Sequence, residues 1–196
     1  NMSRGLAERD RMRDLLGKVA SPAVAEQLLK QKIELGGEER HVTVMFTDIR
    51  NFTELCETLS PHQSLGLLNR YLARISGVIE KYDGVVDKYT GDGVMALFGA
   101  PIAHADDPEL AILAALEIDR QIIALGRDLA VEKLPNPNVG IGINTSRVIA
   151  GNIGTASRLN YTVLGDGVNL AARLESLPQR YNVPLVVGQE PRERGP

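Results

Sequence analysis

The most informative stretch of the sequence is Val85-Val-Asp-Lys-Tyr-Thr-Gly-Asp-Gly-Val-Met-Ala-Leu-Phe98. Apolar, β-branched runs flank the segment Thr90-Gly91-Asp92-Gly93, a pattern that predicts a β-hairpin. We expect Gly91 and Gly93 to take the positive φ values of a tight turn, so that the turn presents the Asp92 carboxylate. Gly-Asp is also a common turn pair without any function, and the hairpin alone leaves that alternative open.

A second predicted strand also ends in a carboxylate. The run His41-Val-Thr-Val-Met-Phe-Thr-Asp-Ile49 alternates as a strand does and delivers Asp48 at its end. If Asp48 and Asp92 converge, they supply hard oxygen ligands, which select Mg²⁺, Mn²⁺ or Ca²⁺. Mg²⁺ with a phosphate substrate fits best, because protein sites often hold it by one or two carboxylates plus substrate phosphates. The alternative is that Asp48 caps the helix that follows it.

Composition narrows the class of protein. The 196 residues are 43% hydrophobic and 24% charged, enough for one substantial core, and the net charge of -3 offers no basic surface for nucleic acid. The single cysteine, Cys56, and three histidines give neither a disulfide nor a zinc cluster, which favours a cytoplasmic location. No apolar run approaches the roughly 20 residues that span a bilayer, so we expect no membrane contact by this chain.

The remaining elements follow from periodicity and turn residues. Residues 1–37 are expected to form a helical leader that transmits a signal, with a helix from Ser21-Pro22 to Leu29 and a domain boundary at Gly36-Gly37. The alternative for residues 1–20 is a solvated, partly frayed leader. A short helix to about Thr58 is expected after Asp48. A long helix then begins at Ser60-Pro61, and its expected core face comprises Leu65, Leu68, Leu72, Ile75 and Ile79.

After the hairpin we expect a helix over 105–125 with an apolar stripe of Leu110, Leu113, Ala114 and Ile118. Two short strands over 139–143 and 147–150 are expected around a turn at Asn144-Thr-Ser146. A strand over 159–163, a helix over 167–177 and a strand over 183–187 complete the chain. This order predicts an α+β sandwich, a mixed sheet covered by helices, with the split βαβ crossover of ferredoxin-like domains.

Two further groups of residues suit a phosphorylated ligand. Backbone N–H groups at Ile49 to Thr53 lie at a predicted helix start, where they can cradle phosphate oxygens, although no Walker sequence is present. Asn169 and Arg173 are four residues apart on one face of the 167–177 helix, where they can orient a sugar and stabilise charge on a reacting phosphate. The alternative for Arg173 is an ordinary surface pair with Glu175 or Glu117.

Three motifs together resemble one family. They are Phe46-Thr-Asp-Ile-Arg-Asn-Phe-Thr53, Lys88-Tyr-Thr-Gly-Asp-Gly-Val-Met-Ala-Leu-Phe98 and Tyr161-Thr-Val-Leu-Gly-Asp-Gly-Val-Asn-Leu-Ala-Ala-Arg-Leu-Glu175. In order and spacing they resemble the catalytic domain of class III adenylyl/guanylyl cyclases, over about residues 41 to 188. The resemblance implies a catalytic domain over 38–188, followed by a tail over 189–196. It implies further strands beyond Val187 that this chain does not contain.

The resemblance assigns roles residue by residue. It implies that Asp48 and Asp92, assisted by the Ile49 carbonyl, bind two Mg²⁺ or Mn²⁺ ions in each site. It implies triphosphate contacts for Asn51, Phe52, Thr53 and Arg147, recognition of the base by Lys88 and Thr162, and catalytic roles for Asn169 and Arg173. Ser146 stands where the family usually has Gly.

The implied reaction converts ATP to 3′,5′-cyclic AMP and pyrophosphate. Lys88 can only donate a hydrogen bond and Thr162 can accept one, which suits N1 and the 6-amino group of adenine. By resemblance, Thr162 places the chain in the bacterial, cyanobacterial-type subgroup of adenylyl cyclases. A guanylyl cyclase is the second candidate, and a non-catalytic nucleotide-binding domain on the same fold is the competing class.

The resemblance also implies partners. Each site of this family lies between two domains, and this chain carries both sets of residues, so we expect a symmetric homodimer that binds ATP. Within it, Lys88 and Asp92 of one chain are expected to serve different sites. An upstream sensor domain is expected in the parent protein.

Overall fold

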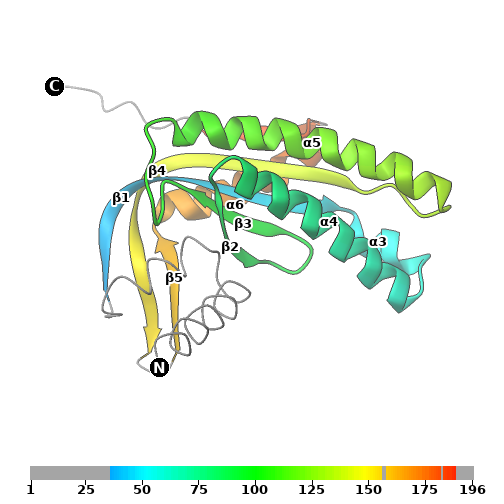
Figure 1. The fold of residues 1–196 in the computed structure, drawn as a ribbon, viewed down its shortest axis with the longest axis horizontal. Coiled ribbons are helices and arrows are strands. Elements are labelled where there is room, and N and C mark those ends of the chain that lie inside the picture. The colour runs from blue at the N-terminus through cyan, green and yellow to red at the C-terminus, as the bar shows by residue number, and fades with distance from the viewer. Residues whose placement is uncertain (1–35, 156–157, 182, 189–196) are drawn as a thin grey trace, which may run out of the picture.

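The computed structural model describes residues 36–155, 158–181 and 183–188. A twisted sheet forms the centre, with α4 (Pro61–Lys81) and α5 (Asp107–Val131) along one face and α6 (Asp166–Tyr181) on the other (Figure 1). The predicted leader helices of residues 1–35 and the tail over 189–196 lie outside the described residues. The first described strand begins at Gly36.

The other helix is α3 (Phe52–Glu57). The strands are β1 (Gly36–Arg50), β2 (Val85–Tyr89), β3 (Val94–Phe98), β4 (Asn138–Thr155), β5 (Arg158–Leu164) and β6 (Leu185–Val187). They form one sheet in the order β2-β3-β1-β4-β5, in which neighbours are antiparallel, and β6 pairs with β4 in parallel. The order β2-β3-β1-β4 is that of two interleaved βαβ units, so the predicted α+β fold with a mixed sheet is confirmed.

Alternation along the strands divides the core between the two faces. Met45 and Ile49 of β1 and Ile141 of β4 point toward α4 and α5. Their neighbours Val42 and Val44 lie in a second cluster on the α6 side. Asp48 has the same parity as Val44, so the pleat places this carboxylate on the α6 side of the sheet.

The two short strands expected around Asn144-Thr-Ser146 are one continuous strand, β4, and the predicted turn is wrong. Residues 144 to 146 pair in unbroken register with Val44, Thr43 and Val42 of β1. Two of the three polar side chains have partners inside the fold: Asn144 Nδ2 donates to the Gly167 carbonyl at 3.0 Å, and the hydroxyls of Thr43 and Thr145 share a hydrogen bond of 2.8 Å. Turn-forming residues therefore stay extended here.

Helix α4 begins where Ser60-Pro61 predicts, with a capping box between Ser60 and Gln63. Its buried face is rotated from the expected one. Ile75 and Ile79 are buried with Leu67 and Tyr71, whereas Leu65 is exposed. Helix α5 extends six residues past its predicted end at Leu125, and in its predicted stripe Leu113 is exposed.

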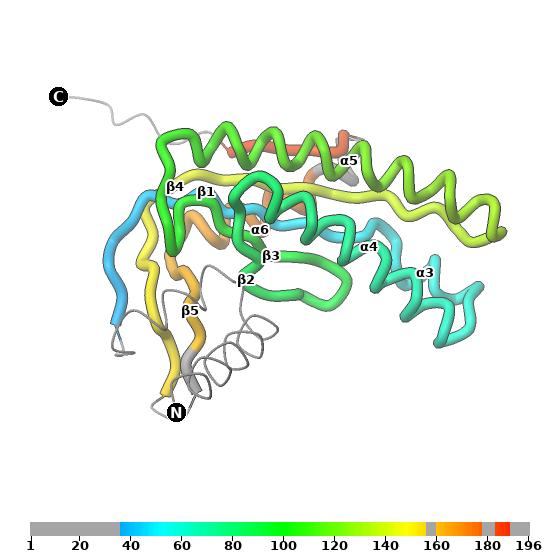
Figure 2. Tube along the Cα trace, viewed as in Figure 1, coloured from blue at the N-terminus to red at the C-terminus, as the bar shows by residue number. Residues whose placement is uncertain are grey.

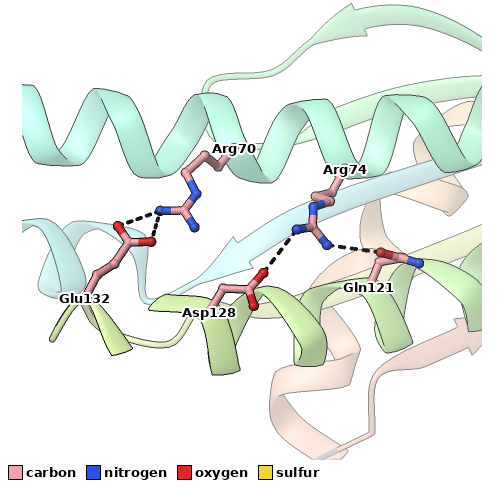
Figure 3. A network of polar contacts seen from close by, with 5 residues as sticks. All are labelled: Arg70, Arg74, Gln121, Asp128 and Glu132. Carbon is pink, nitrogen blue, oxygen red and sulfur yellow. Dashed lines mark hydrogen bonds and ion pairs between the residues drawn. The ribbon is translucent and has the colours of Figure 1, made fainter. Parts of the chain in front are cut away.

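Polar contacts link the middle of α4 to the second half of α5 and the residue after it (Figure 3). Arg70 Nη1 donates to both carboxylate oxygens of Glu132 at 2.9 Å. Arg74 reaches Asp128 and Gln121, each at 3.2 Å. These pairs are largely exposed and contribute little each, so the buried apolar face holds the helices and the arginines fix their alignment.

The first half of β1, the second half of β4 and β5 run together away from the layer that α4 and α5 cover (Figure 2). β5 nevertheless contacts β2, the opposite end of the strand order, through hydrogen bonds between side chains. Among the described residues, no helix combines the length and apolar character needed to cross a membrane.

Candidate active site

The two predicted aspartates lie together. Asp48 is near the end of β1, and Asp92 is at the tip of the β2–β3 hairpin, which Thr90 N–H closes by donating to the Gly93 carbonyl at 3.0 Å. Burial, followed by the charge of Asp92 and a hydrogen bond between the two carboxyl groups, raises the pKa of Asp48 from 3.8 to about 6. Two carboxyl groups that share a site in this way repel one another when both are ionised.

The two glycines of the hairpin, Gly91 and Gly93, are required for different structural reasons. Gly91 takes φ +79°, as expected of a tight turn. Gly93 does not have positive φ, so that expectation was wrong; it is required by close approach instead. A Cβ there would lie 2.2 Å from the Thr47 carbonyl oxygen and 3.3 Å from Asp48 Oδ1. The absence of a side chain thus lets the hairpin bring Asp92 against Asp48.

The donor set fits a hard divalent cation. A cation between Asp48 and Asp92 would relieve the repulsion that raises the Asp48 pKa. The described residues contain no group of three or more His, Cys, Asp or Glu side chains able to hold a metal ion. Two carboxylates leave coordination positions for backbone oxygen, water and phosphate, which is the usual condition of a Mg²⁺ site that receives a phosphorylated substrate.

A third acidic group, Glu175 on α6, faces this pair and was not expected there. Burial, then the charges of Asp48 and Asp92, raise its pKa to about 7, while Arg50 opposes the rise. Helix α6 comes this close because Gly142 of β4 lacks a side chain: a Cβ at Gly142 would lie 2.2 Å from the Glu175 backbone nitrogen. The spacing of residues on one helix carries no signal for this contact, because it depends on how α6 packs on β4.

The start of α3 adjoins Asp48. Its N-cap is Asn51, in the left-handed conformation at φ 54°, so Asp48 is not the cap of this helix. Phe52 packs against the large core cluster, which leaves only its backbone to face a ligand. Thr53 is exposed. Asn51, Phe52 and Thr53 follow directly after the strand that carries Asp48.

The predicted base-reading residues also lie together. Lys88 Nζ of β2 donates to Thr162 Oγ1 of β5 at 3.3 Å. Sequence patterns gave no role to Asp87, whose Oδ2 accepts from Thr162 Oγ1 at 3.0 Å and lies 3.0 Å from Lys88 Nζ. The only available signal was an acidic residue within an apolar strand run, which does not by itself identify a partner.

Asn169 and Arg173 lie one turn apart on α6, and both are exposed. The surface pairing considered for Arg173 does not form: Glu117 accepts from Gln121 and lies near Arg120, and Glu175 faces the aspartates. Arg147 is exposed on β4 opposite His41. Within the described chain, the aspartate pair and the Lys88–Thr162 pair are separate clusters with no hydrogen bond between them.

Comparisons with known proteins identify the family of this chain. The model of the adenylate and guanylate cyclase catalytic domain matches residues 37–187. An uncharacterized protein of Mycobacterium tuberculosis, Rv1319c, is 37% identical over 189 residues, which are 96% of this chain and 34% of that protein. The chain therefore spans about a third of the length of the curated relatives it matches.

Two solved structures are similar in both sequence and fold. The guanylyl cyclase Cya2 is 37% identical with a TM-score of 0.69, over 72% of each chain. The adenylyl cyclase CyaB from P. aeruginosa is 36% identical with a TM-score of 0.69, over 72% of this chain and 74% of that one. With its fold, its paired aspartates and this match over residues 37–187, the chain belongs to the adenylate and guanylate cyclase catalytic domain family.

Proposed function

We propose that the chain is an adenylyl cyclase catalytic domain, which converts ATP to 3′,5′-cyclic AMP and pyrophosphate. The observation that carries the choice of base is the contact of Lys88 Nζ with Thr162 Oγ1 at 3.3 Å. An ammonium offers only donors, and a hydroxyl beside it can accept. Adenine presents an acceptor at N1 and a donor at its 6-amino group, which matches this pair, whereas guanine presents the reverse at both positions.

The reacting end of the nucleotide is assigned to Asp48, Asp92 and the start of α3. Asp48 and Asp92, with the Ile49 carbonyl, would hold two Mg²⁺ or Mn²⁺ ions, and Asn51, Phe52, Thr53 and Arg147 would contact the triphosphate. Bound there, the metal ions lower the pKa of the attacking 3′-hydroxyl and neutralise charge on the departing pyrophosphate. Asn169 orients the ribose, and the Arg173 guanidinium stabilises charge that grows on the α-phosphate.

The active form proposed is a symmetric homodimer in which one chain supplies the aspartates and its partner supplies Lys88, Thr162, Asn169 and Arg173. Asn169 and Arg173 are exposed in the single chain, as residues that meet a nucleotide across an interface must be. Two large apolar side chains near Asn169 in the sequence are also exposed, Leu164 at 55% and Leu170 at 39%. Exposed apolar side chains on this part of the chain are compatible with a surface that another chain covers.

Cyclic nucleotide formation tests the proposal directly. Purified chain is incubated with ATP or GTP in Mg²⁺ or Mn²⁺ over a range of protein concentrations. We expect cyclic AMP from ATP at a much higher kcat/KM than cyclic GMP from GTP, with activity per chain increasing as the chain dimerises. Preference for GTP would refute the assignment of the base, and binding of ATP without pyrophosphate release would refute catalysis in favour of a regulatory domain.

A further inference from the structure

Asp87 lies in an irregular part of β2. Val86 pairs with Ala96 and Lys88 pairs with Met95, so β2 carries one extra residue, Asp87, between them. Neighbouring side chains of a regular strand point to opposite faces of the sheet. The bulge removes that alternation and allows Asp87 and Lys88 to reach the same hydroxyl, that of Thr162.

The contacts around Thr162 determine where its proton lies. Its Oγ1 donates to Asp87 Oδ2 at 3.0 Å and accepts from Lys88 Nζ at 3.3 Å. The Asp87 side chain is only 1% exposed, and an ionised carboxylate can only accept. Burial raises the pKa of Asp87, but the Lys88 ammonium and the Thr162 hydroxyl oppose that rise and favour the ionised form.

The same contacts leave defined groups for a ligand. A hydroxyl has one proton, and that of Thr162 is committed to Asp87, so Thr162 has only a lone pair to offer. Lys88 has three donors, two of which are directed at Asp87 and Thr162, and its side chain is 49% exposed. The cluster therefore presents one donor and one acceptor side by side to a nucleotide base.

We propose that Asp87 is a specificity-determining positioning residue, which holds the Thr162 hydroxyl as an acceptor and the Lys88 ammonium beside it as a donor. This inference rests on the proposed adenylyl cyclase function. Adenine satisfies both groups, because its N1 accepts from Lys88 and its 6-amino group donates to Thr162. Guanine places O6, an acceptor, opposite the Thr162 lone pair, so that two acceptors face one another. Without the Asp87 carboxylate, the Thr162 hydroxyl can rotate and donate to O6, so discrimination against GTP declines.

The variant Asp87→Asn tests this at nearly constant volume, because its amide can donate to Thr162 Oγ1 and release the hydroxyl proton. We expect the ratio of kcat/KM for ATP to that for GTP to fall about tenfold, mainly through KM. The reason is that the Thr162 hydroxyl is no longer held as an acceptor opposite guanine O6. In a Thr162→Val background, Asp87→Asn should lower the ratio much less, because only the contact of Asp87 with the Lys88 ammonium is then left to lose. The control Asp119→Asn alters a half-buried α5 carboxylate, for which the described residues show no ion pair, and should keep the wild-type ratio.

Two results would overturn the inference. One is an equal loss of activity toward ATP and GTP in Asp87→Asn, which indicates a purely structural role at the β2–β5 contact. The other is an equal fall in the ratio with and without the Thr162 hydroxyl. The wild-type chain tests the proposed function separately: a preference for GTP refutes both proposals. If the wild type converts neither nucleotide, the proposal that the chain is a cyclase is wrong. The preference for ATP over GTP is then measured as the ratio of their affinities, from displacement of fluorescent N-methylanthraniloyl-ATP by each nucleotide.

Discussion

Replacement of Asp92 by Asn should stabilise the metal-free protein while it abolishes cyclase activity. Burial and the nearby Asp92 carboxylate raise the pKa of Asp48 from 3.8 to about 6. Because the folded-state pKa is above the unfolded value, ionisation of Asp48 costs stability, and this cost is complete above about pH 6 and absent below pH 3.8. Removal of the Asp92 charge returns the pKa of Asp48 toward its ordinary value and reduces the cost.

The magnitude follows from the causes of that rise. Burial comes first and Asp92 second, and Asp48 is only half-buried, so screening reduces the contribution of the charge. We expect a gain of about 0.5 to 1 kcal/mol at pH 7.5, which corresponds to about 1 to 4 °C in Tm for a domain of this size. The gain should disappear toward pH 4, where Asp48 is protonated in both variants.

The assay is thermal unfolding from pH 4 to pH 8 with EDTA, repeated with Mg²⁺. Added Mg²⁺ should raise the Tm of the wild type more than that of Asp92→Asn, because the variant has lost a ligand. Asp119→Asn is the matched control and should show no gain that depends on pH. A lower Tm of metal-free Asp92→Asn at pH 7.5, or a gain that persists at pH 4, would refute the electrostatic reasoning.

Three further outcomes are expected. Gly93→Ala should lower Tm and should lower kcat/KM by more than about tenfold, because the added Cβ would lie 2.2 Å from the Thr47 carbonyl oxygen. Gly77→Ala is the control: a Cβ at this position of α4 meets open space, so the variant should raise Tm by a few degrees. Apparent Mg²⁺ affinity should decline below about pH 6 as Asp48 takes up a proton, by about tenfold per pH unit in a calorimetric titration. A mixture of Asp48→Ala and Arg173→Ala chains should recover activity that neither variant has alone. With random pairing, about half of the dimers are mixed and each has one intact site of two, so about a quarter of the wild-type activity is expected. Mixed dimers without activity would contradict the shared site.

Much of the fold could be predicted because its signals are local. The hairpin follows from Gly91 between apolar runs, and the start of α4 follows from Ser60-Pro61 and Gln63. The predictions that failed depended on tertiary contacts. Asn144 looks like a turn residue until Gly167 of a distant helix provides its hydrogen-bond acceptor. On α4, leucine spacing alone could not show which of two overlapping stripes faces the sheet.

In the candidate site too, the residues with local signals could be predicted and those that depend on tertiary contacts could not. Asp48 and Asp92 could be paired in advance because each follows a strand pattern, and the resemblance to a family supplied Lys88 and Thr162. Asp87 and Glu175 could not be assigned. One depends on a bulge that alters the alternation of β2, and the other on the depth at which α6 packs over Gly142. Neither property is visible in the periodicity of a single segment.

The unbroken strand β4 has a consequence for control of the proposed cyclase. Its 18 residues have a contour length of roughly 60 Å. Hydrogen bonds to β1 over residues 138–152 and to β5 over residues 149–155 support the strand along its whole length. The strand contains no turn at residues 144 to 146, so it has no flexible point there. In the proposed dimer, we expect a regulatory signal to act by shifting or rotating one chain against the other, since flexing within a chain would break the ladder that supports it.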